Sequence, residues 1–127
     1  MPQTAKLFLV LGSIAALAAV LIGAFGAHAL KDRIAPELMP AYKTGVEYHF
    51  YHALGLVAVG LVLLHFPESR PLAWSGWTML AGIVLFSGSL YVLSLTGVRW
   101  LGAITPLGGV AFLVAWALLA YGVWDAK

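Results

Sequence analysis

Four long stretches without charged residues limit what this chain can fold into. Between its scattered Lys, Arg, Asp and Glu residues, apolar runs occupy positions 7–30, 48–67, 71–98 and 100–124. About 20 apolar residues in a helix cross a hydrocarbon layer roughly 30 Å thick. Each stretch is long enough to cross, so the sequence predicts four membrane-spanning segments.

Composition and patterning decide between helices and strands. Hydrophobic residues make up 62% of the chain and charged residues only 9%, whereas soluble domains are about 25% charged. Strands of a membrane barrel alternate apolar and polar residues, and the runs 54–64 and 110–120 do not. Helices satisfy every backbone polar group in lipid. We expect an all-α, antiparallel four-transmembrane-helix bundle, one domain over residues 1–127, with helices near 7–30, 43–65, 72–96 and 101–124.

The connections set the topology. The segments 66–71 and 97–100 are tight turns that force antiparallel neighbours, whereas 31–41 is a longer, charged loop. Four spans place both termini on the same side of the bilayer. Three basic residues on that side against four on the other are too small a bias to assign the side by the positive-inside rule. We expect a multi-pass plasma-membrane protein, in a bacterial inner membrane, with the orientation left open.

The partners follow from the same features. The basic residues are scattered, which argues against a nucleic-acid partner, and the lipid bilayer is the expected environment.

Close helix packing in lipid relies on small residues, and the first predicted helix carries them at every fourth position: Ala15, Ala19, Gly23 and Ala27. This stripe predicts a helix contact, within the chain or with a second copy or another membrane protein, and we favour the contact within the chain.

Polar residues are predicted to gather at one side of the membrane. His28 ends the first helix, Glu47, His49 and His52 begin the second, and Arg99 and Thr105 lie near the start of the fourth. All lie within about two turns of a predicted helix end, where side chains reach the interface. Ionisable groups inside a membrane are functional candidates, but an interfacial or structural role explains these equally simply.

Three kinds of chemistry are compatible with this polar end. His49 and His52 are about 60° apart around a helix and, with His28, could bind a metal ion, but Glu47 is roughly 140–160° away from them. His28 opposite His52 could bind haem. The group could also form the mouth of a proton or solute route. None is a specific signature, and Glu47 is a more natural partner for Arg99 or a loop lysine.

Catalysis is not indicated. The chain has no cysteine and no Gly-x-Ser-x-Gly nucleophile elbow. We therefore expect no enzyme activity, no metal and no cofactor, and a non-enzymatic membrane component that acts through helix, lipid or protein contacts. A small transporter or proton-linked protein is the alternative, and a metal- or haem-binding protein is the third hypothesis.

Four motifs carry a family resemblance over nearly the whole chain. They are Gly-Ala-Phe-Gly-Ala-His at 23–28, Glu-Tyr-His-Phe-Tyr-His at 47–52, Leu-Phe-Ser-Gly-Ser-Leu-Tyr at 85–91, and Thr-Pro-Leu-Gly-Gly at 105–109 followed by Trp116. The chain resembles the small membrane proteins of YgdD type, whose eukaryotic relatives include transmembrane protein 256. The resemblance implies a compact four-helix membrane protein with no assigned activity, cofactor or catalytic residue. It also implies that position 49 is commonly glutamine, which weakens a paired-histidine metal site.

Overall fold

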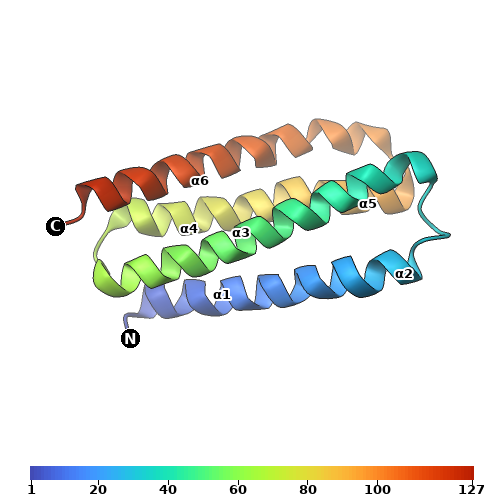
Figure 1. Cartoon of the computed structure of the whole chain (residues 1–127). Helices are drawn as coiled ribbons and strands as arrows, with labels where there is room; N and C mark the ends of the chain where they lie inside the picture. The colour runs from blue at the N-terminus through green and yellow to red at the C-terminus, as the bar shows by residue number, and fades with distance from the viewer.

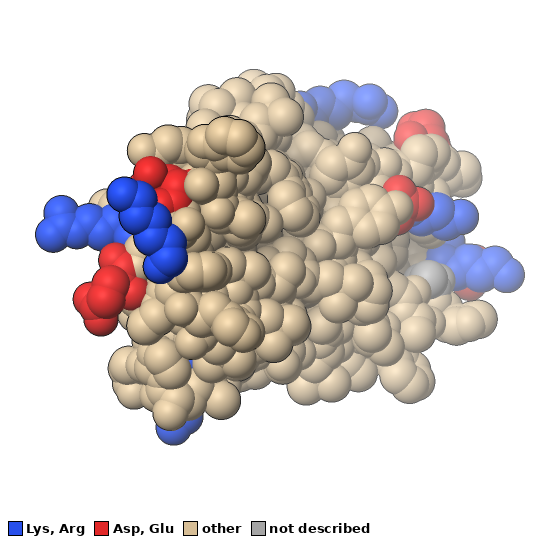
Figure 2. Space-filling view, turned by 60° about the vertical axis from the view of Figure 1, so that its left-hand side comes forward, with Lys and Arg blue, Asp and Glu red and all other residues tan. Residues whose placement is uncertain are grey.

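The computed structural model describes residues 1–127, except for the side chain of Ala27. Four helical segments are long and apolar enough to cross a membrane: Gln3–Gly26, Pro36–His65, Arg70–Thr96 and Arg99–Asp125. The prediction of an all-α bundle with four spans is confirmed. Both termini lie at one end of the bundle (Figure 1). On the face shown in Figure 2, the charged side chains gather toward the two ends of the molecule.

Two of the spans contain a widened, π-helical turn. In the first span, α1 (Gln3–Val20) continues through the π-helical η1 (Leu21–Gly26) into the short α2 (Ala27–Ala29). In the third span, α4 (Arg70–Gly82) continues through the π-helical η3 (Ile83–Ser87) into α5 (Gly88–Thr96). Such turns leave carbonyl groups outside the regular hydrogen-bond ladder. In lipid such carbonyls need partners, and in η1 the Tyr42 hydroxyl supplies one to Ile22, as described below.

The second span is one continuous helix. It begins with the 3-10 turn η2 (Pro36–Leu38) and proceeds as α3 (Met39–His65). The sequence placed the start of this helix near residue 43, after the charged, proline-containing segment 31–41. The structure starts it at Met39, because Pro40 fits the first turn of a helix, where its missing N–H costs no hydrogen bond.

The fourth span follows a tight connection. Gly97 takes a left-handed backbone conformation (φ 72°) that ends α5, as glycine can do without steric cost. The 3-10 turn η4 (Arg99–Ala103) leads into α6 (Thr105–Asp125), with Pro106 in its first turn. Residues 99–103 are therefore the turn before α6, which starts later than the predicted residue 101.

The helices pack in two close pairs. A Cβ atom added at Gly12 of α1 would lie 2.8 Å from the backbone nitrogen of Val57 and 2.9 Å from the carbonyl oxygen of Ala53, so α1 approaches the backbone of α3 there. In the second pair, the Ser75 hydroxyl of α4 donates to the Ala115 carbonyl of α6 over 2.7 Å. The α3 and α4–α5 segments pack against each other, and α1 and α6 lie on opposite sides of them (Figure 1).

The small-residue stripe lies on the α3 side of the first span. Ala19 is buried, Ala15 packs against the core, and a Cβ added at Gly23 would lie 2.9 Å from a methyl group of Val46 on α3. Ala27, the fourth member of the predicted stripe, lies outside the described residues. The described part of the stripe therefore contacts another helix of the same chain.

Candidate functional site

The six candidate polar residues do not form one cluster. His28, Glu47 and Arg99 are exposed, and Thr105 is half-buried. His49 and His52 are buried, with 6% and 5% of their surface exposed, respectively. Both buried histidines belong to the side of α3 that packs against other helices, which we call the inner face of α3. The structure thus separates two interior histidines from residues that remain on the surface.

His49 connects α3 to α5 through its ring. Its Nδ1 atom lies 2.8 Å from the hydroxyl oxygen of Tyr91. A hydroxyl group both donates and accepts, and a neutral imidazole carries one donor and one acceptor nitrogen. A neutral His49 ring therefore satisfies this hydrogen bond in either tautomer.

His52 has its own, separate partners. Its Nδ1 donates to the Tyr48 carbonyl one turn earlier over 2.7 Å, and its Nε2 accepts from the indole N–H of Trp116 on α6 over 3.0 Å. The imidazole also stacks on Phe112, with ring centroids 3.5 Å apart and planes 7° apart. Both ring nitrogens of His52 are therefore used by a neutral ring.

The structure places His52 deeper in the membrane than the sequence predicted. His52 is the central residue of the 27-residue helix α3, roughly 20 Å from either end at 1.5 Å per residue. The prediction that it lies within about two turns of a helix end is therefore wrong. The error follows from the early start of α3 at Met39. His52 belongs to the middle of the membrane, where an unpaired polar ring would be costly.

This geometry does not support metal or haem binding by the histidines. A metal ligand needs a free nitrogen lone pair, and in His52 that lone pair accepts a hydrogen bond from Trp116, while the Nδ1 atom of His49 is paired with the Tyr91 hydroxyl. His28 is exposed rather than opposite His52. Within the described part of the chain, no three His, Asp or Glu side chains come close enough to hold one metal ion.

The hydroxyl groups of the third span pair with polar groups of neighbouring elements. Ser87, in η3, donates to the Gly45 carbonyl of α3 over 2.7 Å. The hydroxyls of Ser89 and Thr105 lie 2.6 Å apart and join α5 to the start of α6. Thr105 is therefore a packing residue rather than part of a site with the histidines. These bonds join the third span to α3 and to the start of α6.

Four aromatic residues that sequence reasoning did not select contact the buried histidines or the widened turn of the first span. The Tyr42 hydroxyl donates to the Ile22 carbonyl, which lies in the π-helical η1, and Tyr91, Phe112 and Trp116 hold the two histidines. The resemblance motifs already contained Tyr91 and Trp116, which was the one available signal. Among the described residues, every buried side-chain nitrogen and oxygen has a hydrogen-bond partner.

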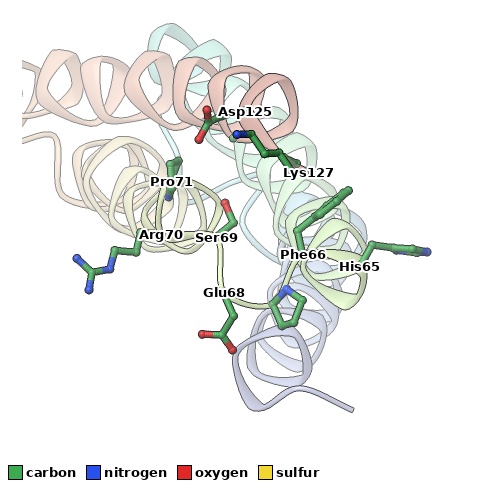
Figure 3. Close-up of a pocket in the computed structure, with 11 residues that line it drawn as sticks. His65, Phe66, Glu68, Ser69, Arg70, Pro71, Asp125 and Lys127 are labelled. Atoms are coloured by element: carbon green, nitrogen blue, oxygen red, sulfur yellow. The ribbon is translucent and has the colours of Figure 1, made fainter.

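A hollow at the end with the termini is a second candidate. Its lining includes His65, Glu68, Arg70, Asp125 and Lys127, from the turn between α3 and α4 and from the end of α6. In Figure 3 the side chains of His65, Glu68 and Arg70 point in different directions. Charges of both signs that do not converge on one point select no class of ligand.

Comparison with known proteins places the chain in a family. The family model described as protein of unknown function (DUF423) matches residues 22–109. The UPF0382 membrane protein YwdK of Bacillus subtilis is 52% identical over 114 residues, which cover 90% of this chain and 93% of that protein. The UPF0382 membrane protein SSP2132 of Staphylococcus saprophyticus is 44% identical over 117 residues, 92% of this chain and 96% of the relative.

The chain belongs to the DUF423 family. Because its relatives carry the name membrane protein and four of its helices are long and apolar enough to span, this DUF423 protein is a multi-pass membrane protein of an uncharacterised family. No solved structure matches it. The DUF423 match contains His49 and His52 but ends before Phe112 and Trp116, whereas the similarity to YwdK extends over most of the chain.

Proposed function

We propose that this protein is a non-enzymatic component of a bacterial plasma membrane that acts through contacts of its outer surfaces with lipid and with membrane proteins. One observation carries the proposal: the interior polar groups are already occupied by one another. His52 uses both ring nitrogens within the bundle, His49 pairs with Tyr91, and Ser87 and Ser89 bond to neighbouring elements. A site for chemistry needs groups that are free to meet a substrate.

The proposal also covers the membrane topology of the chain and its wider family relationship. Four spans leave both termini on the same side of the membrane, and both lie at one end of the bundle (Figure 1). We also propose that the family tie extends to the YgdD-type proteins and to transmembrane protein 256. The motifs that end at His28, His52, Tyr91 and Gly109 support this relationship.

Native mass spectrometry of the protein, gently extracted from its own membrane, tests the proposal. We expect lipids and protein subunits as the bound masses. A stoichiometric bound mass that is neither lipid nor protein, present in the natural chain and absent from His52→Leu, would contradict it. His28→Leu is the matched control, because His28 is exposed and outside the interior network.

The transport alternative is tested by flux. We expect proteoliposomes that contain the protein to show the same proton flux as empty liposomes, with and without a membrane potential. Proton flux well above the empty liposomes that disappears in His49→Leu and His52→Leu would assign the interior to transport. Folding of both variants is checked by their helical circular dichroism before the flux is compared.

A further inference from the structure

One face of α3 is not covered by other helices. Lys43, Glu47, Tyr51, Leu54 and Leu61 are all exposed, and their spacing of four, four, three and seven residues places them on one stripe of the helix. Tyr51, Leu54 and Leu61 are 53%, 50% and 51% exposed. We call this stripe the outer face of α3. It runs along the helix that lies between α1 and α6 (Figure 1).

The outer face carries polar groups at depths where lipid offers them no partner. Tyr51 is next to the central residue of α3, and Glu47 lies roughly 12 Å from the first residue, Met39, at 1.5 Å per residue. A helix of this length extends about 5 Å beyond each side of a 30 Å hydrocarbon core. Glu47 then starts inside the hydrocarbon, where a carboxylate facing lipid is costly.

Two other tyrosines of the bundle, in α3 and α5, show how such a hydroxyl can be paired within the chain. The hydroxyl of Tyr42 donates to the Ile22 carbonyl, and that of Tyr91 pairs with His49. The Tyr51 hydroxyl has no hydrogen-bond partner among the described residues, and Tyr51 is half exposed. A hydroxyl in hydrocarbon without a partner loses its hydration and gains nothing in exchange. The outer face therefore needs a protein surface that supplies polar partners at these depths.

We propose that the partner is a second copy of this chain, bound through the outer face of α3 about a two-fold axis along the membrane normal. This inference rests on the proposed function, because it names one of the protein contacts. A two-fold axis brings the same residues of both copies together at equal depth. The acidic Glu47 and the basic Lys43 lie one helical turn apart, so each copy offers a cation beside the other copy's carboxylate.

The other residues of the stripe fit the same symmetry. A hydroxyl both donates and accepts, so one Tyr51 can donate to the Tyr51 of the second copy. Leu54 and Leu61 meet apolar copies of themselves on the other side of the membrane's midplane. The face thus complements itself in charge and in hydrogen bonding, whereas a different partner would have to supply both.

Cysteine crosslinking in native membranes tests which face is shared. The chain has no cysteine of its own, so single-cysteine variants report one position each. We expect oxidation of Leu54→Cys to give covalent dimers. Leu113→Cys on α6 is the control, because Leu113 is 72% exposed but lies on another helix. Equal crosslinking at both positions, or none at Leu54, would overturn the assignment of the face.

Charge exchange tests the pairing in liposomes, with dimer formation followed by energy transfer between labelled copies over a range of protein-to-lipid ratios. We expect Glu47→Lys to weaken association by roughly ten-fold, the loss of about one polar contact between helices in lipid. Lys43→Glu combined with Glu47→Lys should restore it. Tyr51→Phe should weaken it by a smaller factor. Unchanged association in Glu47→Lys, or a double variant no better than the single one, would overturn the pairing.

The two proposals fail in different ways. A native mass spectrum that shows a monomer with a tightly bound lipid, or a complex with another membrane protein alone, would overturn the dimer and leave a contact function standing. A bound metal or haem that depends on His52 would overturn the proposed function itself. Circular dichroism of Glu47→Lys and Tyr51→Phe establishes that a lost dimer is not a lost fold.

Discussion

The two faces of α3 treat polar groups in opposite ways. On the inner face, both ring nitrogens of His52 are hydrogen-bonded, and His49 pairs with the Tyr91 hydroxyl of another span. On the outer face, the Tyr51 hydroxyl lacks a partner among the described residues, and Glu47 is exposed. Adjacent residues of one helix thus differ in whether the chain itself completes their hydrogen bonds.

This difference separates polar groups that hold the fold from polar groups that await a partner. In lipid there is no hydrophobic force between helices, so packing and interhelical hydrogen bonds provide the association. The inner face uses its polar groups for that purpose within one chain. The outer face also carries polar groups, but these gain an interhelical partner only when another molecule binds. Substitutions on the inner face should therefore change the free energy of unfolding, and substitutions on the outer face should change the association with another molecule.

The largest expected effect comes from breaking the contact on the inner side of α3. In Gly12→Leu, the new side chain would push against the backbone of Ala53 and Val57, which cannot rotate away. We expect a loss of about 3 kcal/mol in the free energy of unfolding, as for overpacked cores. Reversible unfolding in mixed detergent micelles, followed by circular dichroism at low protein concentration, measures it.

The neighbouring residue provides the control for this prediction. Ser13 is exposed, and its hydroxyl bonds to the Leu9 carbonyl of its own helix over 2.7 Å. Ser13→Leu adds the same side chain on the lipid side and should leave the free energy of unfolding unchanged or slightly raised. Equal losses in the two variants would mean that α1 does not pack against α3 through Gly12.

An intermediate effect should distinguish His52 from Tyr51 directly. His52→Leu leaves the Trp116 N–H without an acceptor in the middle of the membrane, and an unsatisfied buried donor costs about 2 kcal/mol. Tyr51→Leu removes a hydroxyl that has no partner in the described chain, so the free energy of unfolding of the monomer should change little. The same micelle experiment measures both. A Tyr51→Leu loss as large as that of His52→Leu would remove the distinction between the faces.

The sequence predicted the fold well because the number of membrane spans depends on each stretch of the chain separately. Each apolar stretch shows by itself that it can cross a membrane, and the short turns fix antiparallel order. The helix starts were less accurate. The prediction placed the start of α3 near residue 43 because it treated the proline-containing segment 31–41 as a loop. The helix starts at Met39 instead, because Pro40 fits its first turn, where a missing N–H costs no hydrogen bond.

The site was predictable only within one helix. The 100° rotation per residue correctly separated Glu47 from His49 and His52, and in the structure Glu47 is exposed while both histidines are buried. The rotation could not show that His49 faces Tyr91 while His52 faces Trp116. Those pairings depend on how each helix is turned about its own axis, which one sequence does not specify.

The smallest expected effect tests how the inner hydroxyl groups contribute. Ser87→Ala removes a 2.7 Å hydrogen bond to the Gly45 carbonyl. The substitution leaves no unpaired carbonyl, because in a regular helix the Gly45 carbonyl still accepts from the backbone N–H four residues later. We therefore expect a loss of about 0.6 kcal/mol, typical of interhelical hydrogen bonds in membranes, measured by micelle unfolding against Ser13→Ala, which should show none. A loss near that of His52→Leu would mean that the η3 turn depends on Ser87 to keep its shape. The difference between the losses of unfolding free energy in His52→Leu and in Ser87→Ala then measures the cost of an unpaired donor in lipid. Tyr51 is proposed to avoid this same cost by pairing with a second copy.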